Sequence, residues 1–225
     1  VSTMFDRIAP YYDFLNRLLS LGIDTRWRKQ AIEQLREGRP QVILDVATGT
    51  ADVALEAARS LRPERIIGLD ISNEMLDIGR QKVRRRGMDH LIDLRHGDSE
   101  NLPFEDNTFD AITVAFGVRN FEDLERGLSE MRRVLKKGGK LVVLEFSQPT
   151  AFPFRQLFHF YFRRILPLIG RLTSKDPRAY RYLYESVQAF PNGEQFLDIL
   201  QKTGYKSNQC LPLTLGICSV YSGVK

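Results

Sequence analysis

The stretch that indicates the fold is Val42-Ile43-Leu44-Asp45-Val46-Ala47-Thr48-Gly49-Thr50-Ala51-Asp52, in a chain of 225 residues. Its first half has the length and composition of a buried strand, and helical spacing begins at residue 52. The small residues between them would form a turn that lets a ligand approach the backbone closely. This segment predicts a strand, a turn and a helix, with the turn forming part of a binding site.

The same alternation continues along the chain. Strands are predicted at residues 42–47, 65–70, 92–96, 109–115 and 140–146, and helices at 52–60, 73–86 and 124–135. We expect Gly138 and Gly139 to end the last of these helices and to lead into the fifth strand. Strands and helices in alternation are typical of a mostly parallel sheet with helices on both faces. The predicted fold is therefore α/β and Rossmann-like.

The two ends of the chain and one long insertion complete this prediction. A helix at 192–203, stopped by Gly204, precedes two β-stretches that are expected to pair antiparallel, at 205–213 and 216–223. We predict a single domain over residues 1–225. Its parts would be a helical lid at 1–38, a cofactor-binding core at 39–148, a helical insertion at 149–190 that covers the substrate, and a C-terminal helix and hairpin at 191–225.

The insertion at 149–190 combines aromatic side chains with positive charge. Arg155, His159 and Arg163 recur every four residues among apolar neighbours, which predicts an amphipathic helix with a narrow basic stripe. The insertion holds seven Arg and Lys and two acidic residues, so its net charge equals the +5 of the whole chain. Such a segment fits a cover for a lipophilic substrate, and also contact with anionic lipid.

Composition excludes several classes of protein. The two cysteines, Cys210 and Cys218, are too few for a disulfide scaffold or a Cys-rich zinc module. The three histidines do not cluster at ligand spacing, so we expect no metal. No targeting segment is visible, and charges interrupt the most apolar stretch, 152–172. We therefore expect a cytoplasmic protein, peripheral to the inner face of the membrane if it contacts lipid at all. The oligomeric state stays open.

Acidic residues follow the predicted strands where an open parallel sheet binds its ligands. Asp45 lies near the end of the first strand, Asp70 ends the second, and Asp98 follows the third. No dinucleotide fingerprint or phosphate-binding glycine loop is present, because Ala47 and Asp52 stand where such a fingerprint needs glycine. The pattern fits a nucleoside-bearing ligand without a pyrophosphate. S-adenosylmethionine meets this description, since its ribose is unphosphorylated and its amino and sulfonium groups are cationic.

The chain resembles the demethylmenaquinone/ubiquinone-biosynthesis C-methyltransferases, a branch of the class I S-adenosylmethionine-dependent methyltransferases. Beyond the first strand, the resemblance rests on blocks at residues 4–16, 20–28, 102–110, 116–120, 145–149, 180–186 and 213–217, such as Phe116-Gly117-Val118-Arg119-Asn120 and Glu145-Phe146-Ser147-Gln148-Pro149. These blocks are spread over nearly the full length. They are far more specific than the motif of the first strand alone.

This resemblance implies roles for individual residues toward S-adenosylmethionine. Gly49 and Thr50 would border its methionine part, Asp70 would bind the ribose hydroxyls, and Asp98 with Ser99 would hold the adenine; Asp45 is expected to belong to the same site. The chain departs from the class motif at Ala47 and Ala51, where glycine is usual, but alanine still permits close approach. It also has Ala115 where members of the family often have serine, which puts a hydroxyl contact there in doubt.

The resemblance further implies methyl transfer to a ring carbon of a polyprenylated quinol, such as demethylmenaquinol or the equivalent benzoquinol. The enzyme must then stabilise a phenolate-like oxygen. Arg119 is the expected electrostatic group, because a guanidinium is permanently cationic. Asn120 would add a donor to the substrate or cap the next helix. Tyr12 and His159 are further candidates for substrate contact. Lid packing would also explain Tyr12, and a lone histidine on an aromatic helix is more often a structural or interfacial residue.

Other functions remain open from the sequence alone. The substrate could be a different small lipophilic or aromatic molecule. A nucleic-acid methyltransferase would suit the pI of about 9.3, but the Asn-Pro-Pro-aromatic motif of amino-methylating enzymes is absent, and the run from Arg80 to Arg86 has the pattern of a solvated helix face. A non-catalytic adaptor would keep the cofactor and lose the chemistry. We expect a small quinol as the partner and no nucleic acid.

Overall fold

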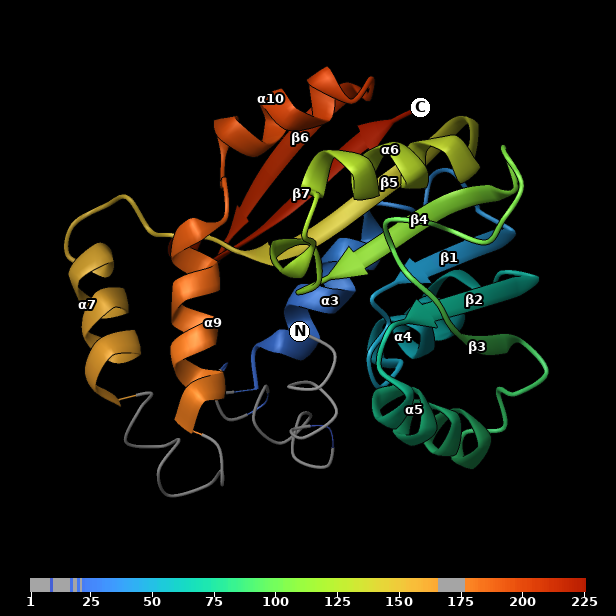
Figure 1. The fold of residues 1–225 in the computed structure, drawn as a ribbon, viewed down its shortest axis with the longest axis horizontal. Coiled ribbons are helices and arrows are strands. Elements are labelled where there is room, and N and C mark those ends of the chain that lie inside the picture. Colours follow the sequence, from blue (N-terminus) through green and yellow to red (C-terminus); the bar gives the residue numbers. More distant parts are fainter. Residues whose placement is uncertain (1–8, 10–16, 18–19, 21, 166–176) are drawn as a thin grey trace.

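A computed structural model describes residues 9, 17, 20, 22–165 and 177–225. Seven strands form one sheet in the order β3-β2-β1-β4-β5-β7-β6. Their bounds are β1 Val42–Val46, β2 Arg65–Asp70, β3 Ile92–His96, β4 Phe109–Ala115, β5 Leu135–Phe146, β6 Lys206–Leu213 and β7 Cys218–Val224. The first five are parallel, and β7 runs antiparallel to both β5 and β6. The predicted Rossmann-like sheet with a C-terminal antiparallel pair is confirmed (Figure 1).

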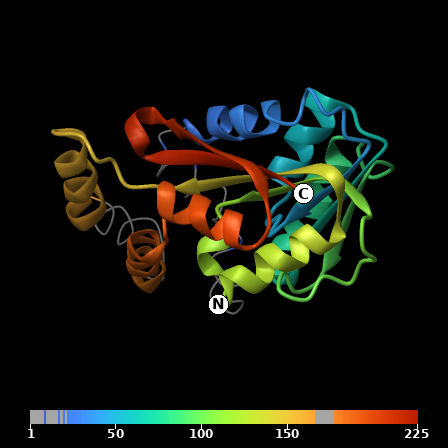
Figure 2. The same cartoon turned by 90° about the horizontal axis from the view of Figure 1, so that it is seen from above.

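Helices cover both faces of the sheet (Figure 2). Their bounds are α3 Asp24–Glu33, α4 Asp52–Leu61, α5 Asn73–Arg85, α6 Leu124–Val134 and α10 Glu194–Lys202. Two neighbours on β1 show how the core divides: Ile43 belongs to the cluster that includes residues of α3, α4 and α5, whereas Leu44 belongs to the cluster that includes residues of α6 and α10. Both side chains are fully buried, because successive residues of a strand face opposite sides and this sheet is covered on both.

One predicted boundary is wrong. Gly138 and Gly139 were expected to end a helix, but α6 already stops at Val134 and β5 begins at Leu135. Leu135 is fully buried and pairs with Phe109 of β4 before the register shifts to the pair of Ala111 and Lys140. The two glycines therefore lie in an irregular part of β5, where the left-handed backbone of Gly138 accommodates the shift.

The insertion forms two helical arms beside the sheet. The first is α7 (Phe154–Phe160), extended by a π-helical turn, η3 (Tyr161–Ile165), and the second is α9 (Pro177–Ala189). Phe158, Phe162 and Val187 join the arms in a small apolar cluster. In both views α9 lies between α7 and the main body of the molecule (Figures 1 and 2). No helix in the described ranges is long and apolar enough to span a bilayer.

Candidate functional site

A cavity of about 200 Å³ lies where the parallel strands end at their carboxyl termini. It is built from the turn after β1, the end of β2, the loop after β3 and the segment after β4. The lining residues are Ala47, Gly49, Leu69, Asp70, Ile71, Met75, Gly97, Asp98, Ser99, Glu100, Ala115, Phe116, Gly117, Asn120, Phe121 and Glu122. Acidic groups, small residues and apolar side chains thus share one enclosure.

The turn after β1 has the conformation that its small residues suggested. Ala47, Gly49 and Ala51 all have positive φ, at 53°, 54° and 67°. Alanine occupies this left-handed region only at a cost, so the surrounding structure must hold the turn in place. Part of that support is the hydrogen bond from Thr48 N to Leu69 O, at 3.0 Å. The wall of the cavity next to Gly49 is therefore backbone and methyl groups.

Asp70 organises the cavity at the end of β2. Its Oδ2 accepts a hydrogen bond from Gly49 N at 2.7 Å, and its Oδ1 accepts one from Ser72 N at 2.9 Å. The Ser72 side chain in turn caps α5 by accepting from Met75 N. Asp70 therefore presents a carboxylate to the cavity and joins the turn after β1 to the start of α5.

Asp98 and Ser99 line the cavity from the loop after β3, together with Glu100. Glu100 was not foreseen from the sequence: its Oε1 accepts hydrogen bonds from Glu122 N at 2.7 Å and Asp123 N at 3.1 Å. This carboxylate thereby ties the loop after β3 to the segment after β4, across the rim of the cavity.

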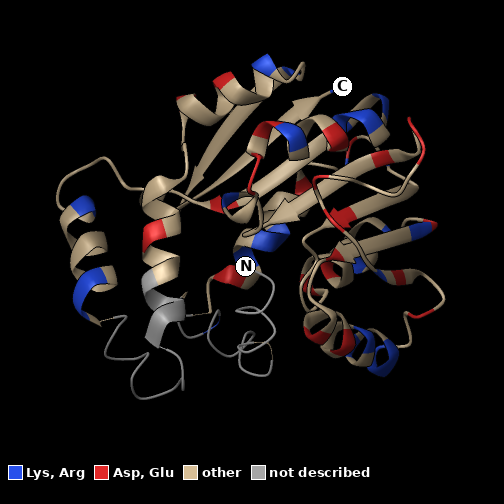
Figure 3. Ribbon diagram, in the orientation of Figure 1, with Lys and Arg blue, Asp and Glu red and all other residues tan. Residues whose placement is uncertain are grey.

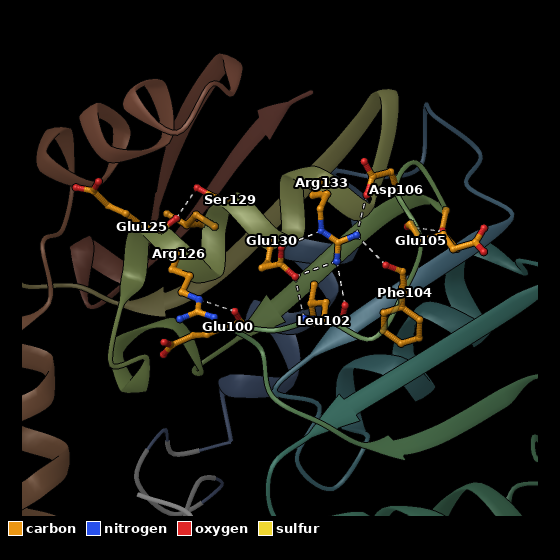
Figure 4. A network of polar contacts seen from close by, with 12 residues as sticks. Glu100, Leu102, Phe104, Glu105, Asp106, Glu125, Arg126, Ser129, Glu130 and Arg133 are labelled. Carbon is orange, nitrogen blue, oxygen red and sulfur yellow. Dashed lines mark hydrogen bonds and ion pairs between the residues drawn. The ribbon is translucent and has the colours of Figure 1, made fainter.

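The following residues of that loop are held by two arginines of α6 (Figure 4). Arg126 Nε donates to Glu100 O at 3.0 Å, and Arg133 donates to the carbonyl oxygens of Leu102 and Phe104. Hydrogen bonds to the carboxylates of Glu130 and Asp106 raise the pKa of the Arg133 guanidinium. The loop that carries Asp98 and Ser99 is thus fixed to the helix behind it.

Asp45 and Thr50, both expected at the cofactor, do not line this cavity. Asp45 is buried and accepts hydrogen bonds from Thr48 Oγ1 at 2.6 Å and Thr113 Oγ1 at 2.7 Å. Burial raises the pKa of its carboxyl to about 6, against the opposing effect of the two hydroxyls. Thr50 lines a separate pocket of about 30 Å³, which shares Ala47, Gly49, Ala115 and Phe116 with the larger one. Asp45 supports the turn, and Thr50 lies beside it.

Arg119 lies in the 3-10 turn η2 (Val118–Asn120), just outside the lining of the cavity. Its Nη1 donates to Phe116 O at 2.6 Å and forms an ion pair with Glu145 Oε1 at 2.7 Å. Glu145 is fully buried; burial raises the pKa of its carboxyl, and the charge of Arg119 opposes that change. The sequence placed Glu145 in a family block but did not indicate this pairing.

Asn120 does line the cavity, and the insertion reaches it. Its Oδ1 accepts a hydrogen bond from the hydroxyl of Tyr182, on α9, at 3.0 Å. Among the predicted substrate contacts, His159 is not part of the cavity lining: it belongs to α7, the outer of the two arms in Figure 1, and its ring lies beside that of Phe158. Tyr12 lies outside the described residues.

The residues that line the cavity fit S-adenosylmethionine. A carboxylate at the end of β2 suits a ribose diol, and the apolar side chains of Leu69, Ile71 and Met75 suit an adenine ring. Gly117 allows the segment after β4 to pack closely against the turn after β1, because a Cβ at this position would clash with Ala47 Cβ at 2.6 Å. The described part of the lining contains acidic groups and no Lys or Arg, so it favours a cationic ligand over a phosphate.

Comparison with known proteins agrees with this geometry. Residues 1–225 match the ubiE/COQ5 methyltransferase family. A demethylmenaquinone methyltransferase of Bacteroides fragilis is 51% identical over all of this chain and 92% of its own length. A ubiquinone/menaquinone biosynthesis C-methyltransferase UbiE of Geotalea daltonii is 50% identical, covering 100% of this chain and 96% of its own. Among solved structures, a S-adenosylmethionine-dependent methyltransferase of Thermotoga maritima, a possible histamine N-methyltransferase, shares the fold with a TM-score of 0.67 at 21% identity, with both chains fully covered.

Proposed function

Because the chain belongs to the ubiE/COQ5 methyltransferase family over its whole length, we propose that it methylates a ring carbon of a polyprenylated quinol, with S-adenosylmethionine as methyl donor. The observation that carries this proposal is that about half of the residues, along the entire chain, are identical to those of enzymes named for menaquinone methylation or quinone biosynthesis. The relative from Bacteroides fragilis is named a demethylmenaquinone methyltransferase, so a naphthoquinol is the first substrate to test. The resemblance seen in the sequence is confirmed at the level of the family.

The cavity residues divide the work of holding the cofactor. Asp70 would accept hydrogen bonds from the ribose hydroxyls, Asp98 and Ser99 would face the adenine, and Gly49 would border the methionine part. Thr50 lies outside the cavity, in the small neighbouring pocket that shares Gly49, so it would border the methionine part only from there. Asp45 would contribute indirectly, because its carboxylate accepts a hydrogen bond from Thr48 and so holds the turn after β1 in place. When bound, S-adenosylmethionine supplies a methyl group attached to a positively charged sulfur.

The ring carbon becomes nucleophilic as a neighbouring ring hydroxyl loses its proton. A new carbon–carbon bond then forms as the carbon–sulfur bond breaks, and the ring carbon releases its hydrogen as a proton to water. The protein must stabilise the negative charge on the ring oxygen during this step. Asn120 lines the cavity and offers an amide N–H, while the Arg119 guanidinium lies behind it with a buried Nε that has no hydrogen-bond partner among the described residues. We assign the direct contact to Asn120 and the electrostatic support to Arg119.

A line of aromatic rings leads from the cavity toward the insertion. Phe116, in the lining, lies 4.8 Å from Phe146 between ring centroids, and Phe146 lies 6.5 Å from Phe162. The ring of Phe162 in turn lies 4.4 Å from that of Phe158, at a tilt of 34°. Apolar contacts of this kind suit a prenyl chain. The insertion would then cover the tail while the ring enters the cavity.

The side chains exposed on and beside α7 are suited to an anionic lipid surface, where such a quinol would be found. Phe152, Leu157 and Phe160 are 80%, 58% and 58% exposed. Arg155, Arg163 and Arg164 are exposed among them, and residues 149–165 contain no Asp or Glu (Figure 3). Exposed apolar groups beside arginines are the pattern of a helix that lies in a membrane interface.

Membrane contact can be tested with vesicles. Leu157→Asp should reduce co-sedimentation with vesicles that contain phosphatidylglycerol, and it should leave turnover of a short-tail quinol unchanged. Leu211→Asp is the matched control, because Leu211 is 44% exposed on the edge strand β6. Equal binding of wild type and Leu157→Asp would contradict the proposed surface.

The reaction itself is tested with S-adenosylmethionine carrying a labelled methyl group. The purified chain is incubated with reduced naphthoquinols and benzoquinols, each with and without a prenyl tail. We expect label on the ring carbon of at least one tailed quinol. Cofactor binding without any labelled quinol would refute the proposal and favour an adaptor, whereas label in DNA or RNA would favour a nucleic-acid methyltransferase.

A further inference from the structure

Tyr182 is a hydrogen-bonding side chain of the insertion that reaches the lining of the cavity. It is half-buried on α9, and its hydroxyl donates to Asn120 Oδ1 at 3.0 Å, across 62 positions of sequence. The helix α9 packs against η2, which carries Asn120. The contact therefore joins the insertion to the segment that follows β4.

The partners of Asn120 decide which way its amide faces. Its Nδ2 donates to Phe116 O at 3.4 Å, and a carbonyl oxygen can only accept. The nitrogen must therefore lie on the side of Phe116 and the oxygen on the side of Tyr182. A planar amide held at both ends has one N–H left, and Asn120 contributes to the cavity wall.

Tyr182 is suited to be a permanent donor in this arrangement. Burial raises the pKa of its hydroxyl, and the nearby charge of Arg119 only opposes that rise in part. The phenol thus keeps its proton throughout the physiological range.

We propose that Tyr182 is a positioning residue, which orients the Asn120 amide so that its remaining N–H meets the ring oxygen of the substrate. This inference rests on the proposed function, and it adds a role for the insertion besides covering the prenyl tail. The ring site would be complete only with α9 in place, because the group that orients Asn120 comes from α9.

The test compares Tyr182→Phe with Tyr184→Phe. Tyr184 lies on the same helix, and its hydroxyl accepts a hydrogen bond from Arg163 Nε at 3.1 Å, away from the cavity. Each variant loses one hydroxyl and keeps its ring. Tyr182→Phe should lower kcat on a tailed quinol by roughly three- to tenfold, the range of one neutral hydrogen bond, while the Kd of S-adenosylmethionine and the unfolding temperature stay as in Tyr184→Phe.

A mutant cycle shows whether Tyr182 acts through Asn120. In the Asn120→Ala background, adding Tyr182→Phe should cause no further loss of kcat, because the oriented amide is already gone. A full additional loss in that background, or equal kcat for Tyr182→Phe and Tyr184→Phe, would overturn the inference.

A second measurement does not depend on the substrate. In ¹⁵N NMR spectra of the cofactor-loaded protein, the side-chain amide signals of Asn120 should shift in Tyr182→Phe and not in Tyr184→Phe. Unshifted signals in both variants would also refute the contact. If no quinol were methylated, the proposed function would fail, and these spectra would still decide whether Tyr182 orients Asn120.

Discussion

The buried carboxyl of Asp45 should make the stability of this protein depend on pH in an unusual direction. Burial raises its pKa from 3.8 to about 6. In the folded state the carboxyl therefore holds its proton more tightly than in the unfolded chain. Its contribution to stability is fully present below the unfolded pKa and is lost as the pH rises through the folded value.

The size of the effect follows from the shift. A difference of about two pKa units corresponds to about 3 kcal/mol at about 1.4 kcal/mol per unit. Replacement by asparagine removes the titration and keeps the shape of the side chain. Relative to wild type, Asp45→Asn should thus gain about 3 kcal/mol in free energy of unfolding between about pH 4 and about pH 7.

The measurement is urea unfolding at a series of pH values, followed by the fluorescence of Trp27. This residue is the only tryptophan and is buried against the core. At each pH, the free energy of unfolding of wild type is subtracted from that of the variant, and the change of this difference with pH is the result. Any packing cost of asparagine is the same at each pH and therefore does not contribute to that change. Parallel curves for the two proteins would refute the assignment of a raised pKa to Asp45.

Asp110 provides a control on the neighbouring strand β4. Burial would raise its pKa, but hydrogen bonds from Lys136 Nζ and from the amides of Val42 and Gln41 outweigh this and lower it. Its stabilising contribution is therefore present above the unfolded pKa and is lost only as the pH falls through the lower folded value. Between about pH 4 and about pH 7, the free energy of unfolding of Asp110→Asn should therefore change with pH as that of wild type does, whereas that of Asp45→Asn should not.

Three further changes test the site. Asp70→Ala should weaken S-adenosylmethionine binding at least about tenfold through lost charge-assisted hydrogen bonds, and unchanged affinity by calorimetry would rule out the ribose contact. Glu145→Gln should cost about 3 kcal/mol or more of unfolding free energy, because the Arg119 charge stays buried and unpaired; a loss in urea below about 1 kcal/mol would contradict a buried ion pair. Gly117→Ala should reduce cofactor affinity, since the new Cβ would push Ala47 into the cavity; normal affinity in the same assay would show that the wall can yield.

Much of the site was predictable because it depends on the order of elements. In a parallel sheet every strand ends at the same edge, so Gly49, Asp70, Asp98 and Ser99 had to come together there once the alternation was recognised. All four line the cavity, as does Asn120. Their roles toward the cofactor and substrate remain predictions.

Other positions could not be judged from their local pattern. Asp45 has the sequence context of a ligand, but its side chain is bonded to Thr113, 68 positions away on the adjacent strand. Arg119 was expected to face the substrate, but it forms an ion pair with Glu145 on the strand β5. Glu100 carried no distinguishing local signal, and Tyr182 lay in a family block that gave no indication of its contact with Asn120, because the partners of both residues lie in other loops and helices.

The α/β fold could thus be predicted from the amino-acid sequence, because hydrophobic periodicity is a local property of a chain. The family followed from the resemblance of sequence blocks along the chain, and residues 1–225 match it. Packing in three dimensions determines which polar side chains line the cavity and which form hydrogen bonds with one another. A carboxylate or guanidinium takes its partner from whatever the packing brings within about 3 Å, and at Asp45, Arg119 and Asn120 that partner comes from another strand or helix.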